Sequence, residues 1–107
     1  MIKFMVVLYR RPDFTPSQFR RHLLEVHAPL ARNLPGVRKY VHNYPADDPR
    51  RKSPGWGAIV ELYFDNWAAM EAAWATPAGA ASDADLPKFA DLTRTTWSVV
   101  EEVNLLP

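Results

Sequence analysis

The sequence contains no cysteine, which excludes disulfide bonds, thiolate metal ligands and cysteine nucleophiles. An excess of one charge is also missing. There are 13 basic and 12 acidic side chains, and the basic residues form no stripe of the kind that binds nucleic acid. The apolar run at residues 2–9 is too short to span a membrane, and no small-residue cleavage site follows it. These absences predict a soluble, cytoplasmic protein that binds neither nucleic acid nor membrane.

Metal-binding patterns are absent as well. The chain has three histidines and no HxxxH or HExxH spacing. His22 and His27 are five residues apart, which places them on different sides of an ideal helix. The four tryptophans offer an aromatic lining for a haem, but a small core needs no haem to explain them. We therefore expect neither a metal nor another cofactor.

What the chain does contain is enough apolar material for one modest core. Its 107 residues are 48% hydrophobic and 12% aromatic, which predicts a single globular domain over residues 1–107. Runs rich in β-branched and aromatic residues predict strands at 2–9, 37–44, 58–65 and 95–105.

A complete helix start stands at "TPSQ", where Thr15 is the N-cap, Pro16 the first helical residue and Gln18 the partner in a capping box. The helix should end at "PG", residues 35–36, and Pro29 should kink or restart it. Its predicted buried stripe consists of Phe19, Leu23, Val26, Leu30 and Leu34.

The second predicted helix starts after Asn66 and ends near Pro77. The alanine-rich stretch that follows is predicted to be irregular, with a short helix over residues 86–92. The resulting order βαββαβ predicts an α+β fold, the ferredoxin-like plait, with one four-stranded antiparallel sheet and both helices on one face.

The face of this sheet that carries no helix is expected to be buried against another surface. Strands 2–9 and 58–65 are apolar on both sides, which would leave a larger apolar patch than soluble monomers usually expose. This predicts a homodimer through the sheet faces, a dimeric α/β barrel. The alternative is a face of mixed character that needs no partner.

Three motifs resemble the EthD family of the dimeric α/β-barrel superfamily: His-Ala-Pro at residues 27–29, Leu-Pro-Gly at 34–36 and Arg-Lys-Tyr-Val at 38–41. The resemblance covers nearly the whole chain. It implies a dimer with one small-molecule pocket per subunit between sheet and helices, usually without a cofactor. Similar proteins include a methylmuconolactone isomerase and polyketide-modifying monooxygenases and cyclases. The isomerases use a cysteine where this chain has Leu62, so thiol chemistry is not expected.

His27 and Tyr40 are the candidate catalytic residues. His27 lies on or beside the buried helix stripe, where an imidazole can move a proton near pH 7. Pro29 leaves a backbone carbonyl free, such as that of Glu25, which could orient a ring nitrogen of His27 for this role. The alternative is a helix histidine that is only bonded to a backbone carbonyl at the kink. Tyr40 matches a pocket tyrosine of the isomerases and can hold a developing oxyanion. Its alternative is an edge-strand tyrosine packed on a helix.

Four further residues are candidates for substrate binding: His42, Leu62, Phe64 and Trp74. His42 lies on the same strand face as Tyr40, although the alternative is that His42 is an exposed histidine on an edge strand. Glu61 points to the opposite face from Leu62, which favours a structural ion pair at the dimer over a catalytic base.

The sequence leaves two main functions open, and a third possibility beside them. One is a cofactor-independent enzyme acting on a hydrophobic carbonyl compound, lactone or quinol by isomerisation, dehydration, cyclisation or oxidation by O₂. The other is a non-catalytic binding or accessory protein of an oxidative degradation system. A structural partner of an oxidoreductase is a third possibility.

Overall fold

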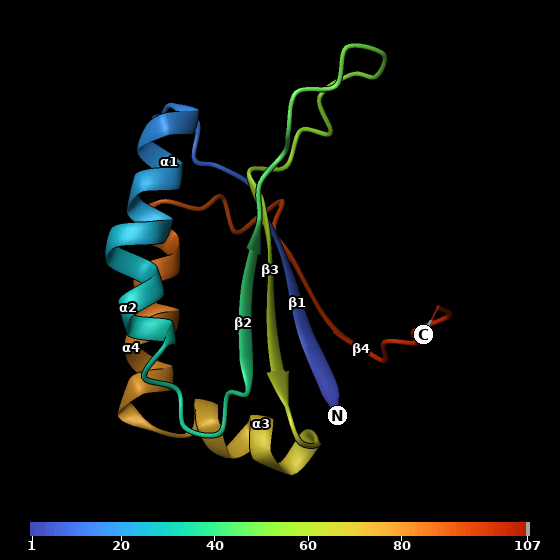
Figure 1. Ribbon diagram of the computed structural model, residues 1–107. Helices are drawn as coiled ribbons and strands as arrows, with labels where there is room; N and C mark the ends of the chain where they lie inside the picture. Colours follow the sequence, from blue (N-terminus) through green and yellow to red (C-terminus); the bar gives the residue numbers. More distant parts are fainter. Residues whose placement is uncertain (107) are drawn as a thin grey trace.

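The computed structural model describes residues 1–106, whose strands form one antiparallel sheet in the order β2-β3-β1-β4. The strands are β1 (Ile2–Leu8), β2 (Lys39–Asn43), β3 (Ala58–Phe64) and β4 (Thr96–Val100). The helical elements are α1 (Pro16–His22), η1 (Leu23–His27), α2 (Ala28–Ala31), α3 (Trp67–Trp74), α4 (Pro77–Asp85) and η2 (Leu86–Lys88). Figure 1 shows α1, α2 and α4 along one face of the sheet and α3 at its lower end. The predicted ferredoxin-like fold is confirmed.

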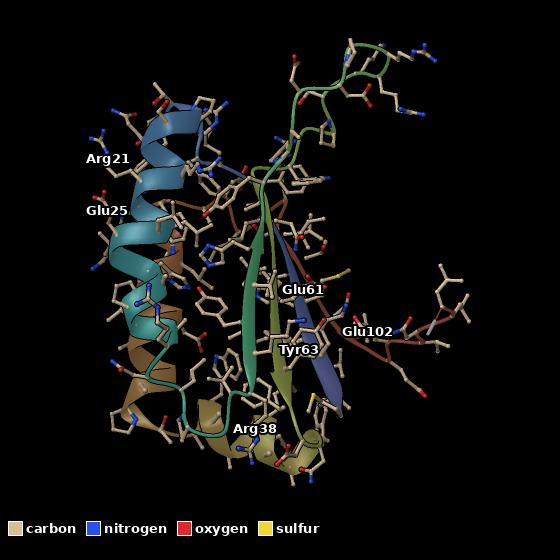
Figure 2. The ribbon with its side chains drawn as sticks, viewed as in Figure 1. Arg21, Glu25, Arg38, Glu61, Tyr63 and Glu102 are labelled. Atoms are coloured by element: carbon tan, nitrogen blue, oxygen red, sulfur yellow. The ribbon has the colours of Figure 1, made fainter. Side chains whose placement is uncertain are left out.

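Strand alternation divides the sheet into two faces. In the register of β1 with β3, Val6 lies opposite Val60 and Phe4 opposite Leu62, and these residues contribute to the core beneath the helices. The intervening residues, among them Met5 and Glu61, therefore point to the other face, which we call the outer face. Figure 2 shows Glu61, Tyr63 and Glu102 on this side, away from the helices.

The first helix starts as predicted. The Thr15 hydroxyl accepts a hydrogen bond from the backbone N–H of Gln18 at 3.1 Å, and the Gln18 side chain accepts one from the backbone N–H of Thr15 at 2.8 Å. This reciprocal capping box satisfies two backbone donors that would otherwise lack partners.

One turn of this helix is wider than an α-helical turn. In η1 the N–H of Ala28 donates to the carbonyl of Leu23, five residues back, and an ordinary α-helical segment then restarts ahead of Pro29. Because Pro29 has no N–H and its ring crowds the preceding turn, a wider turn relieves the conflict. The predicted stripe was wrong at Val26, which is 46% exposed, because the extra residue rotates His27 (6% exposed) inward in its place.

The stretch after α3 is helical, which corrects the prediction of an irregular segment. Thr76 caps α4 through a hydrogen bond from the N–H of Gly79 at 3.2 Å. A Cβ atom at Gly79 would lie 2.5 Å from the carbonyl oxygen of Trp74, so only glycine lets α4 pack this tightly on the end of α3. The helix predicted at residues 86–92 is reduced to the short turn η2.

The last strand is shorter than the predicted 95–105, and residues 101–106 belong to no strand. No helix within residues 1–106 combines the length and the apolar character needed to cross a membrane.

Candidate functional site

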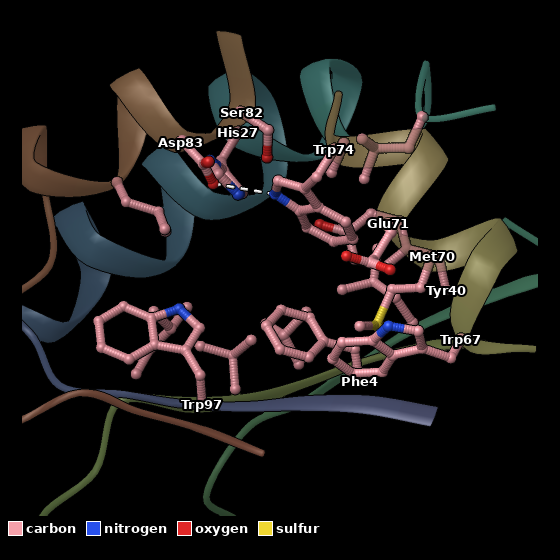
Figure 3. Close-up of a pocket in the computed structure, with 17 residues that line it drawn as sticks. Phe4, His27, Tyr40, Trp67, Met70, Glu71, Trp74, Ser82, Asp83 and Trp97 are labelled. Atoms are coloured by element: carbon pink, nitrogen blue, oxygen red, sulfur yellow. Dashed lines mark hydrogen bonds between the residues drawn. The ribbon is translucent and has the colours of Figure 1, made fainter. Parts of the chain in front are cut away.

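A cavity of about 410 Å³ lies between the sheet and the helices. In Figure 3, His27, Ser82 and Asp83 gather on the helix side, whereas Phe4 and Trp97 lie on the sheet side. A mostly apolar cavity with a few polar groups suits a hydrophobic organic molecule. Its apolar and aromatic lining includes Phe4, Leu62, Trp67, Met70, Trp74 and Trp97.

His27 enters this cavity from η1 and has one side-chain partner. Its Nδ1 lies 2.9 Å from Oδ2 of Asp85, a residue of α4 that is 3% exposed. Because a carboxylate accepts hydrogen bonds, Nδ1 carries the proton and Nε2 presents its lone pair. No residue within the described part of the chain hydrogen-bonds this Nε2. Nε2 is therefore the nitrogen available to a ligand in the cavity.

The surroundings keep the His27 ring neutral. Burial lowers the pKa of His27 below its ordinary value, although hydrogen bonding to Asp85 acts in the opposite direction. A ring that is neutral at pH 7 and whose Nε2 faces an apolar cavity can accept a proton from a bound molecule. The predicted alternative, a ring bonded to a carbonyl at the kink, is wrong because Asp85 holds the ring instead.

Asp85 also binds a second histidine. Nε2 of His22 lies 3.0 Å from Oδ2 and 3.1 Å from Oδ1 of the carboxylate. The prediction that His22 and His27 lie on different sides of the helix is wrong, because the wide turn brings residues five apart to the same side. Both rings pack on Phe89, with centroid distances of 4.5 Å for His22 and 5.4 Å for His27. Sequence reasoning missed Asp85, since its segment was predicted to be irregular.

Tyr40 lines the same cavity from β2. Its hydroxyl lies 2.7 Å from Nε2 of His42, whose Nδ1 lies 2.9 Å from the hydroxyl of Tyr44. Burial lowers the pKa of His42 to about 4 and raises that of Tyr40. At neutral pH this chain of three side chains therefore consists of neutral groups, with Tyr40 protonated.

The four predicted binding residues divide into two pairs. Leu62 and Trp74 line the cavity. His42 is half-buried and lies behind Tyr40 instead of in the wall. Phe64 is fully buried and packs against the ring of Trp74, with centroids 5.8 Å apart. Both residues therefore support cavity-lining side chains from behind.

Glu61 lies on the outer face, where Lys3 Nζ is 2.6 Å from its Oε1 and Asn43 donates to its Oε2 at 2.9 Å. Leu62 faces the helices, so the predicted structural ion pair is present and Glu61 is remote from the cavity. Within residues 1–106, no group of three or more histidine and carboxylate side chains is placed to hold a metal ion.

The sequence pattern that defines the EthD domain matches residues 11–93. The chain belongs to the EthD family. An EthD-family protein from Bacillus halodurans has a solved structure with a TM-score of 0.80 and 30% identity, covering 96% of this chain and 100% of that one. An uncharacterised 11.0 kDa protein from the thcB–thcC intergenic region of Rhodococcus erythropolis is 28% identical over 96% of this chain and 97% of its own length.

More distant structures share the fold of this EthD-family chain. SnoaB from Streptomyces nogalater, a cofactor-independent oxygenase, has a TM-score of 0.71 at 13% identity, covering 99% of this chain and 96% of that one. A dimeric protein with a ferredoxin-like fold from Bacteroides fragilis has a TM-score of 0.69 at 16% identity, with coverages of 94% and 95%.

Proposed function

We propose that this EthD-family protein is a cofactor-independent enzyme that carries out acid/base chemistry on a hydrophobic carbonyl compound, lactone or quinol. One observation carries the proposal. His27, held by Asp85 at Nδ1, offers a neutral Nε2 to an apolar cavity of about 410 Å³. A base positioned by a carboxylate beside a largely apolar cavity is the arrangement that general-base catalysis uses. The cofactor-independent oxygenase with the same fold supports the class of reaction without fixing it.

Tyr40 supplies the second half of the mechanism. When His27 removes a proton from the carbon next to a carbonyl, negative charge develops on the carbonyl oxygen. The raised pKa of Tyr40 keeps its hydroxyl protonated. When Nε2–H of His42 donates to the Tyr40 oxygen and Tyr44 donates to Nδ1 of His42, the single hydroxyl proton of Tyr40 is left to donate to the substrate oxygen. Return of the proton from His27 to another atom of the substrate completes an isomerisation or cyclisation. For an oxidation, the ionised substrate would pass an electron to O₂ and combine with the superoxide formed to give a hydroperoxide; loss of water from the hydroperoxide would leave a carbonyl group.

Replacing His27 by alanine is expected to abolish most of the turnover, because His27 is the one imidazole among the described residues that line the cavity, and the carboxylates of Glu71 and Asp83 in its wall are weaker bases. The natural ligand is first identified by native mass spectrometry of protein purified from its host, and turnover of that compound is then measured. Arg21→Ala is the control, since Arg21 is exposed and points away from the sheet (Figure 2). Full turnover by His27→Ala would refute the proposal.

A non-catalytic carrier is the second candidate, and the largely apolar lining of the cavity favours it. A carrier needs the apolar walls but not the base. It would bind the identified compound unchanged, and His27→Ala would bind it about as tightly as the wild type. An enzyme would convert the compound and lose this ability in the variant.

We further propose that two copies pair through their outer faces. This face carries apolar side chains around a partly buried Lys3–Glu61 ion pair, whose side chains are 12% and 17% exposed. Burying such a pair is more tolerable because Lys3 also donates to Glu102 and Glu61 also accepts a hydrogen bond from Asn43. The apolar members of the outer face are Met5, Val7, Val41, Ile59, Tyr63 and Val100.

Light scattering is therefore expected to give twice the 12.2 kDa mass of one chain at micromolar concentration. Val7→Arg places a charge on the outer face opposite Ile59 and Thr96, with no acid directly across the sheet, and should yield monomers, since an unpaired buried charge is strongly unfavourable. Glu25→Arg introduces the same side chain on the exposed helix surface and should leave the dimer intact. A monomeric wild type would contradict the pairing.

A further inference from the structure

A second cavity, of about 360 Å³, lies between the start of α1 and the loop that joins β2 to β3. Figure 1 shows this loop extending beyond the end of the sheet near which α1 begins. Among residues 1–106, the lining contains no carboxylate and three arginines, which are Arg10, Arg20 and Arg94. It shares no residue with the lining of the site containing His27. An inference about this cavity is therefore independent of the proposed function.

Each guanidinium is held in place by something other than an acid. Arg10 donates through Nη1 to the carbonyl of Phe14 and is half-buried. Arg20 lies over the ring of Tyr44 at 4.2 Å, and Arg94 over the ring of Tyr9 at 4.3 Å. A guanidinium carries five N–H donors, so each of these interactions leaves several donors for a ligand.

Among the arginines outside this cavity, three have acidic partners within residues 1–106, whereas Arg21, Arg32 and Arg50 form no ion pair there. Arg11 pairs with Asp13, Arg38 with Asp65 and Arg51 with Asp48, at 2.9, 2.9 and 3.1 Å. None of the three arginines of the second cavity forms an ion pair within residues 1–106. Like charges that converge on one concave surface repel one another, and an anion bound between them removes this repulsion and gains charged hydrogen bonds.

The rest of the wall indicates what kind of anion fits. Trp56 and Tyr44 present aromatic surface to the cavity, and Ser53 adds a hydroxyl group. A small inorganic ion would leave the aromatic surface uncovered, whereas a flat organic body would cover it.

We propose that this second cavity is a binding site for an organic anion, a carboxylate or phosphate attached to an aromatic group. The guanidinium groups of Arg20 and Arg94 bind the charged end, and Trp56 and Tyr44 contact the ring. Arg10 adds positive charge while it holds the turn at Phe14.

Phenyl phosphate and benzoate are the probes, and titration calorimetry with backbone amide NMR is the measurement. We expect saturable binding of at least one probe, with shift changes centred on Tyr44, Trp56 and Arg94. Inorganic phosphate should bind at least tenfold more weakly than phenyl phosphate, and neutral phenol should not bind at this place. The stronger of the two probes shows whether the site prefers phosphate or carboxylate.

Arg20→Gln and Arg94→Gln should each weaken binding about tenfold or more. Arg21→Gln is the matched control because it removes the same charge one residue along the same helix, outside the cavity. Arg20→Lys keeps the charge and should fall between wild type and Arg20→Gln. Equal weakening by Arg20→Gln and Arg21→Gln would reveal unspecific charge attraction and overturn the proposal. So would shift changes confined to other surfaces, or no saturable binding of either probe.

Discussion

Replacing Asp85 by asparagine is expected to lower turnover about 10²- to 10⁴-fold while the protein stays folded. The carboxylate holds Nδ1 of His27 at 2.9 Å and fixes the proton on that nitrogen. An asparagine amide can instead donate to Nδ1, which would move the ring proton to Nε2 and remove the base from the cavity. Asp85 is thus a positioning residue, which acts on the substrate only through His27.

Two measurements distinguish this role from a merely structural one. Asp85 raises the pKa of His27 against the larger effect of burial, so removing the carboxylate should lower that pKa further. The acidic limb of the pH–rate profile, which follows protonation of the base, should therefore move to lower pH. Nitrogen NMR of the ring should show the proton on Nδ1 in the wild type and on Nε2 in the variant.

The control for Asp85→Asn is the same change at Asp47, which is exposed in the loop between β2 and β3. Asp47→Asn should leave turnover, the pH profile and the His27 ring unchanged. If Asp85→Asn lowers turnover without a change in the ring or in the pH profile, Asp85 does not act through His27.

The fold was predictable because its signals are local. Runs of β-branched and aromatic residues at 2–9 and 58–65 give the central strands, and the capping box at Thr15 gives the start of the first helix. These patterns depend only on neighbours along the chain, and the order of the elements then restricts the topology to very few arrangements.

The site was predictable only in part, because it depends on one irregular turn and one weakly amphipathic helix. An ideal helix places His22 and His27 apart, and only the wide turn ahead of Pro29 brings both to one carboxylate. Asp85 lies at the end of a helix of small residues that has no apolar stripe. The spacing of apolar residues therefore did not predict this helix. Thr76-Pro77 repeats the start signal of Thr15-Pro16 and was the one local indication of α4.

Truncating Phe89 is expected to lower the stability of the protein more than truncating any other single residue near the site. It is fully buried, and its ring centroid lies 5.4 Å from that of Phe19 and 4.5 Å from that of His22. Replacing it by alanine should lower the free energy of unfolding by about 3–5 kcal/mol, because the lost apolar contact is accompanied by a cavity that neighbours fill only partly. Urea denaturation measures this change.

The same truncation should also disturb the histidine pair, because Phe89 is the surface on which both rings of the Asp85 cluster rest. Phe89→Leu keeps most of the volume and should recover most of the stability, whereas Leu92→Ala, at a residue 38% exposed, should cost less than about 1 kcal/mol. If Phe89→Leu restores stability but the NMR signals of His22 and His27 stay displaced, the flat ring itself orients the imidazoles. If Phe89→Ala costs no more than Leu92→Ala, the packing beneath the site contributes little, and the geometry of His27 depends on Asp85 alone.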